Sequence, residues 1–143
     1  MSLPRAPWLT ALAGMVVVAA LAFVGSWARR PGPGCALDGV KIDPAYRVEV
    51  VDAAGARHAF CCPACAALWL EHQSSSPRAI LVTDETSGES IDAADAWYVR
   101  SRVVTTPATG NRVHAFRNRA DAERHAEKNG GTVLPESESL FHQ

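Results

Sequence analysis

Three of the chain's four cysteines, Cys61, Cys62 and Cys65, lie within five positions, and the fourth, Cys35, lies upstream. Pro63 suits the first turn of a helix, and helical apolar spacing follows it, so this cluster is expected at a helix N-terminus. The dipole and free N–H groups of a helix N-terminus favour thiolate over thiol. Thiolates bind soft metal ions and attack disulfides, and the spacing therefore predicts one of these two kinds of chemistry.

The spacing of Cys61 and Cys65, with Cys35 upstream, is typical of a metal site. Asp38 follows Cys35 by three positions, where a second cysteine would complete a Cys-x-x-Cys motif. An oxygen ligand from Asp38 would suit zinc, whereas two or three thiolates without it would suit a soft ion such as Cu(I). The candidate metal ligands are Cys35, Cys61, Cys62 and Cys65, with Asp38 and His58 as further candidates.

Three alternatives to a transported metal remain open. The first is a structural disulfide from Cys35 to Cys61 or Cys65 in an oxidising compartment. The second is a thiol–disulfide oxidoreductase that uses Cys62 and Cys65, because Cys-Pro-Ala-Cys between a strand and a helix resembles a thioredoxin-type motif. Against it, no β–α unit precedes the motif. The third is a structural zinc module that binds a protein partner. We find no serine–histidine–acid order, phosphate loop or pair of catalytic carboxylates, so we do not expect an enzyme.

The histidines are weaker candidates as ligands. His58 lies in a predicted strand and is expected to face solvent or a neighbouring acid, although it could ligate. Its counterpart His114 lies in a half without thiols, which favours a structural role for both. His72 and His125 are predicted on helix surfaces. An acidic run is predicted to form a solvated connector; its members are Glu85, Glu89, Asp92 and Asp95.

The N-terminus has no charged residue between Arg5 and Arg29, an interval long enough to cross a bilayer as a helix. Residues 1–28 are therefore predicted to form a membrane anchor, with a cleaved signal peptide as the alternative because Ser26-Trp27-Ala28 resembles a cleavage site. Positive-inside counting favours a cytoplasmic domain. A short charged start before a long apolar run is typical of exported proteins, and we expect a single span in the bacterial inner membrane with a periplasmic domain.

The chain after a Pro/Gly linker at 29–34 predicts one order of elements twice: strand, strand, helix, strand. His-Ala-Phe leads into a helix in both halves, at His58 and at His114. The expected fold class is α+β, with two small repeated β-β-α-β units at about 35–83 and 90–134. Together they form a metal-binding domain at 35–134, after a transmembrane helix and before a polar tail at 135–143. The predicted elements are strands 46–51 and 57–60, helix 63–73 and strand 79–82, then strands 96–99, 102–104 and 112–116, helix 119–129 and strand 132–134.

The chain from Cys35 to Leu134 resembles the NosL-like nitrous oxide reductase accessory proteins. The family pattern Cys-x-x-Cys-Gly-Met is similar to Cys-Ala-Leu-Asp-Gly-Val at 35–40. Further similar segments are Ile91-Asp92-Ala93 with Trp97-Tyr98-Val99, the turn Pro107-Ala108-Thr109-Gly110 before Ala115-Phe116, and Gly130-Gly131. The resemblance implies a copper-binding periplasmic protein with duplicated β-β-α-β architecture that helps a copper enzyme to mature.

The departures from this family pattern fall on the metal chemistry. Asp38 replaces the second cysteine, and Val40 and Ala108 replace methionines, so thioether ligation is not available at those places. Phe60-Cys61-x-x-x-Cys65 is instead similar to the second half of the small heavy-metal trafficking domains called TRASH. The resemblance implies a membrane-anchored metallochaperone for Cu(I), with zinc as the alternative metal. Its partner would be a recipient metalloenzyme or a membrane copper transporter; a net charge of −1 gives no case for nucleic acid.

Overall fold

A computed structural model describes residues 34–135 and 140–141. The predicted membrane anchor at 1–28 lies outside the described residues, as do most of the linker and most of the tail. In the described part of the chain, no helix has both the length and the apolar character that a membrane span requires.

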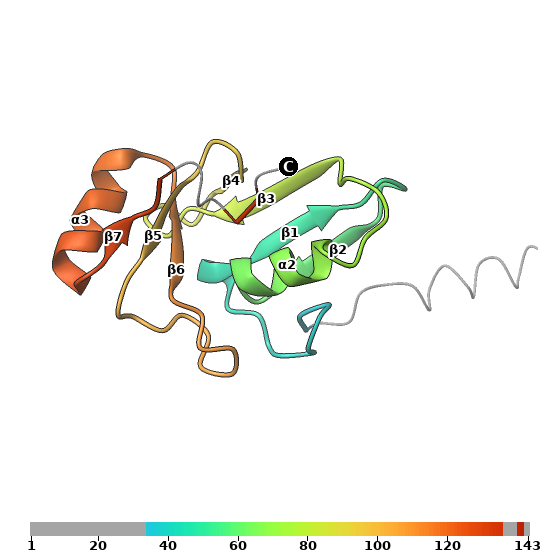
Figure 1. Cartoon of the computed structure of the whole chain (residues 1–143), viewed down its shortest axis with the longest axis horizontal. Helices are drawn as coiled ribbons and strands as arrows, with labels where there is room; N and C mark the ends of the chain where they lie inside the picture. The colour runs from blue at the N-terminus through green and yellow to red at the C-terminus, as the bar shows by residue number, and fades with distance from the viewer. Residues whose placement is uncertain (1–33, 136–139, 142–143) are drawn as a thin grey trace, which may run out of the picture. The chain divides into compact units, whose positions relative to one another are not determined.

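The first half forms a four-stranded antiparallel sheet with the order β2-β1-β3-β4 (Figure 1). The first strand starts two residues later than predicted, because residues 44–46 form a 3-10 turn that the Asp43 side chain caps. The helix ends at Leu70 rather than at residue 73. The elements are η1 (Pro44–Tyr46), β1 (Val48–Val51), β2 (Arg57–Phe60), α2 (Pro63–Leu70), β3 (Ala79–Thr83) and β4 (Ser90–Asp92).

The second half forms a three-stranded antiparallel sheet with the order β6-β5-β7. The predicted strand at 102–104 is wrong, because the Arg102 N–H donates to Asn129 O and the Val103 N–H donates to the Ser101 hydroxyl. The helix has the predicted bounds, with Asn118 as its N-cap and Gly130 in the left-handed region at its end. The elements are β5 (Trp97–Arg100), β6 (Val113–Phe116), α3 (Arg119–Asn129) and β7 (Thr132–Val133).

The described residues have the predicted α+β class. Each half contains strand, strand, helix and strand in that order, and the corresponding strands have the same neighbours, β2-β1-β3 and β6-β5-β7. Strand β4 is an addition to this pattern. It pairs with β3, so residues 90–92, which the sequence assigns to the second unit, belong to the first sheet.

One core joins the two halves. It combines Val48, Val50 and Phe60 of the first sheet with Tyr98 and Ala115 of the second. A smaller core lies between the second sheet and α3, which flanks that sheet on the side away from the first sheet (Figure 1). All four residues of β6 are buried, since both of its faces are covered. The second half is therefore held firmly against the first.

The acidic run is solvated only in part, since Glu89, Asp92 and Asp95 are exposed but Glu85 is half-buried. The Glu85 carboxylate accepts a hydrogen bond from His114 Nδ1 at 2.9 Å, and residues 90–92 form β4. His114 is 1% exposed, which agrees with the predicted structural role. His125, predicted on the helix surface, is half-buried. Its ring packs on that of His114 at 4.1 Å between centroids, and its Nε2 lies 3.3 Å from the Ser101 hydroxyl.

Candidate metal centre

The junction between β2 and α2 positions two of the thiols. The strand ends at Phe60, and Cys62 is the helix N-cap, with an extended backbone at φ −166° and ψ 164°. Pro63 then opens the helix, where its missing N–H costs no hydrogen bond. The first helical turn brings Cys65 back toward the junction, and its Sγ lies 3.5 Å from the Sγ of Cys61.

A tight loop at residues 34–41 brings Cys35 to the same place. The Cys35 N–H donates to Val40 O, and the Gly39 N–H donates to Cys35 O, each at 2.8 Å. Gly39 has a φ of 73°, a conformation that glycine adopts without strain. The Ala36 N–H donates to Ala59 O at 2.8 Å, which ties the loop to the end of β2. The loop is therefore fixed beside the two thiols of the junction.

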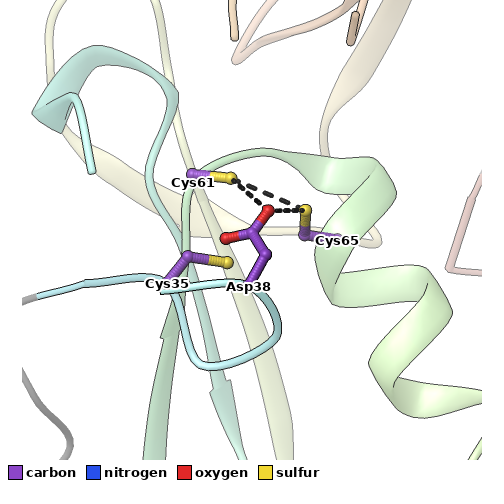
Figure 2. Close-up of side chains that lie close together, drawn as sticks. All are labelled: Cys35, Asp38, Cys61 and Cys65. Atoms are coloured by element: carbon purple, nitrogen blue, oxygen red, sulfur yellow. Dashed lines mark hydrogen bonds between the residues drawn. The ribbon is translucent and has the colours of Figure 1, made fainter. Parts of the chain in front are cut away.

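Four of the predicted ligands come together in what we call the thiol group: Cys35, Asp38, Cys61 and Cys65 (Figure 2). One ligand atom of each lies within 4.8 Å of those of the others. The Asp38 Oδ2 accepts from the Cys65 thiol at 3.4 Å and from the Cys61 thiol at 3.9 Å. All four cysteines of the chain are free thiols in the structure. The group offers three sulfurs and one carboxylate to an ion.

Two other predicted ligands lie outside the thiol group. Cys62 is 0% exposed, and its Sγ points to the Thr109 hydroxyl at 3.6 Å, although it remains 3.9 Å from the Cys61 Sγ. The Nε2 of His58 pairs with Asp52 Oδ2 at 2.9 Å, as expected for a histidine beside an acid, and its ring packs on that of Trp69.

The electrostatics of the thiol group differ from the expectation for a helix N-terminus. Burial raises the pKa of Cys61 to about 12 and also raises the pKa of Cys65, whereas a helix N-terminus was expected to lower them. Burial would raise the pKa of Asp38 too, but the Val40 N–H and the thiols of Cys35 and Cys65 hold it below its usual value. At neutral pH, protonated Cys61 and Cys65 therefore surround a carboxylate, and a bound cation must displace thiol protons.

The second half supports the junction through two threonines that the sequence does not single out as site residues. The Thr106 hydroxyl donates to Cys61 O at 3.2 Å, and the Thr109 hydroxyl contacts Cys62. Their loop at 105–111 is braced by Asn111, whose side-chain amide donates to the Thr105 hydroxyl at 2.6 Å and to Val113 O at 2.9 Å. The sequence Pro-Ala-Thr-Gly predicts a turn in this loop, but it does not predict that the loop contacts Cys61.

A second group that could hold a metal consists of Glu85, His114 and His125. Its polar atoms already bind each other, since His114 Nδ1 pairs with Glu85 and His114 Nε2 lies 3.0 Å from the Ser101 hydroxyl. Ser101 also meets His125 Nε2. We interpret this group as a buried polar network that ties residue 85 to the second sheet.

The comparisons with known proteins agree with this description. A family model described as NosL matches residues 35–138. A crystal structure of the copper chaperone NosL from Shewanella denitrificans matches with a TM-score of 0.64 and 22% sequence identity, over 76% of this chain and 90% of that chain. At this identity the match establishes a shared fold. Among curated proteins, no significant match was found.

Proposed function

The chain belongs to the NosL family, and we therefore propose that it is a copper chaperone that holds Cu(I) through the thiolates of Cys35, Cys61 and Cys65. The observation that carries this proposal is the convergence of three thiols and one carboxylate from two separate segments within 4.8 Å. Soft thiolates select soft ions such as Cu(I). The name of the structural match, a copper chaperone, supports the same metal.

Zinc is the alternative cargo or structural ion. The proximity of the Asp38 Oδ2 to two sulfurs favours this alternative, because three thiolates and an oxygen would complete a tetrahedral zinc site. Zinc forms closed structural sites with four such ligands, and a zinc ion held in this way would stabilise the fold rather than exchange. Metal content and retention decide between the two.

The burial of Cys62 and Cys65 argues against a function as a thiol–disulfide oxidoreductase. A redox-active cysteine needs an exposed thiol with a low pKa. Cys62 is 0% exposed and Cys65 is 4% exposed, and the pKa of Cys65 is raised. The Cys62 thiol is directed to Thr109. These features support metal binding over thiol–disulfide exchange.

The proposed location follows from the N-terminal sequence. Residues 1–28 would anchor the chain in the bacterial inner membrane, residues 29–34 would form a linker, and the domain at 35–134 would lie in the periplasm. The recipient would be a copper enzyme or a membrane copper transporter. A reporter enzyme fused after residue 143, active only in the periplasm, tests this orientation; activity only in the cytoplasm would contradict it.

The metal assignment is tested on the full chain, purified anaerobically in detergent and titrated with Cu(I) while free thiols are counted. We expect about one tightly held copper ion per chain. The double variant Cys61→Ser, Cys65→Ser should lose it, and Cys62→Ser is the matched control that keeps it. Unchanged copper stoichiometry in the double variant would falsify the assignment, and tightly held zinc that copper does not displace would favour the structural alternative.

A further inference from the structure

The carboxylate of Asp38 is the exposed member of the thiol group. Cys35, Cys61 and Cys65 are at most 4% exposed, whereas Asp38 lies at the surface and its Oδ2 contacts two of the sulfurs (Figure 2). We propose that Asp38 is the exchangeable ligand of the copper site, which leaves the ion when a sulfur donor of the recipient protein binds. This proposal rests on the proposed function and assigns the side of the site at which transfer occurs.

The opposite side of the thiol group is closed by protein. Cys62 lies there, 0% exposed, beside Cys61 and in contact with Thr109. Thr106, which is 6% exposed, donates its hydroxyl proton to the Cys61 carbonyl. The loop at 105–111 therefore covers this side. We therefore expect an ion that leaves the three sulfurs to depart on the side of Asp38, not on the side that this loop covers.

The loop that carries Asp38 can release the ion without losing its own structure. Backbone hydrogen bonds fix it at Cys35, Gly39 and Ala36, and none of them uses the Asp38 side chain. That side chain is held by the Val40 N–H, which donates to Oδ1 at 3.0 Å, and by the surrounding cysteine thiols. Rotation of the Asp38 side chain breaks these contacts and leaves Cys35 in place.

The donor chemistry makes the oxygen the first ligand to leave. A carboxylate is a hard ligand and Cu(I) is a soft ion, so the bond to Asp38 is the weakest in the set. A thiolate or thioether sulfur of the recipient forms its bond to the ion as the Asp38 oxygen departs, and the copper remains Cu(I). Each cysteine thiolate of this chain that then leaves the copper ion takes up a proton from water. A thiol of the recipient releases a proton when it binds the ion.

The identity of residue 38 thus sets the rate of release. A cysteine at this position would surround the ion with four sulfurs, a closed set that retains its metal. An asparagine would keep the shape of the side chain but would offer a neutral and weaker oxygen. The variants Asp38→Cys and Asp38→Asn therefore shift the release rate in opposite directions, while the three thiols remain.

The test measures copper release from the full chain in detergent, loaded with Cu(I), to glutathione as the sulfur donor, with bathocuproine disulfonate as the reporter. We expect D38C to release copper at least about tenfold more slowly and D38N at least about threefold faster, each with about one copper bound. A36C adds a thiol to the same loop outside the thiol group and should release at the wild-type rate.

The outcomes separate the two proposals. If D38C and D38N bind copper and release it at the wild-type rate, the role of Asp38 is wrong and the copper chaperone stands. If D38C does not fold, D38N decides alone, and a rate at or below that of the wild type overturns the inference. If the wild-type chain binds no copper, the proposed function itself falls.

Discussion

The Thr106 hydroxyl donates a hydrogen bond of 3.2 Å to the carbonyl oxygen of Cys61, across 45 positions of the chain. Thr106 belongs to the half without thiols, and Cys61 belongs to the half that carries them. This hydrogen bond holds the peptide group of Cys61, which lies between the end of β2 and the start of α2. The geometry of the thiol group therefore depends on both halves.

Thr106→Val should destabilise the domain. The change leaves the Cys61 carbonyl without this donor in a buried position, which costs about 1–3 kcal/mol. Urea denaturation followed by circular dichroism measures the free energy of unfolding. Thr106→Ser keeps the hydroxyl and serves as the control; equal losses in both variants would assign the effect to packing.

Cys62→Ala should keep copper binding and lower stability. Its sulfur is 0% exposed and lies outside the thiol group, so its removal leaves a small cavity but no missing ligand. We expect a loss of about 1 kcal/mol in the free energy of unfolding and an unchanged copper stoichiometry. A copper affinity that falls as far as in Cys65→Ala would make Cys62 a ligand after all.

Copper affinity should rise with pH. The pKa of Cys61 is raised to about 12 and that of Cys65 is also raised, so both thiols are protonated near neutrality and each loses a proton when it binds copper. These two thiols alone predict a gain of at least about a hundredfold in copper affinity per pH unit. Competition with bathocuproine disulfonate between pH 6 and 8 measures the slope, and a flat profile would contradict thiolate binding.

Acid should weaken the domain through Asp84, which is 2% exposed. Burial would raise its pKa, but hydrogen bonds from Ser87 and from the backbone N–H groups of Arg117 and Thr86 hold it below 3.8. Because the folded pKa is the lower one, this stabilisation is complete well above pH 3.8 and is lost as the pH falls through the folded value.

Asp84→Asn is the variant that tests this acid sensitivity. It should cost about 2 kcal/mol at pH 6 and less at pH 3, because below pH 3.8 the aspartate of the unfolded chain takes up a proton and part of the stabilisation is lost. Denaturation of both chains at the two pH values gives the comparison. Asp43→Asn is the matched control, because Asp43 caps the 3-10 turn and is not a hydrogen-bond partner of Asp84. If Asp84→Asn lowers the free energy of unfolding by the same amount at both pH values, the charge of Asp84 plays no part.

Local patterns predicted most of the fold. The helix at 119–129 has a capping asparagine before it and two glycines after it, and these signals fix its ends. The β-branched residues Val103 and Val104 were misleading, because a long-range hydrogen bond from Arg102 to Asn129 and a local one from Val103 to Ser101 decide that segment. One member of the acidic run was mispredicted for a similar reason: Glu85 pairs with His114, far away in the chain, and composition does not reveal this contact.

Some features of the candidate site could likewise be predicted from the sequence, and others could not. Cys61 and Cys65 lie one helical turn apart across a strand–helix junction, so their proximity follows from sequence spacing. Adjacent residues in extended backbone point to opposite sides, and the sequence could not decide whether Cys61 or Cys62 joins the thiol group. Thr106 and Thr109 were missed because their contacts arise only when the two halves pack together.

The loop at 105–111 also has a consequence for biosynthesis. A chain made from its N-terminus presents all four cysteines before the residues that cover Cys61 and Cys62 exist. During that interval these thiols are open to oxidants and to stray ions, and β6 is still missing from the shared core. Protection of the nascent thiols must come from outside the chain until residues 105–116 are complete.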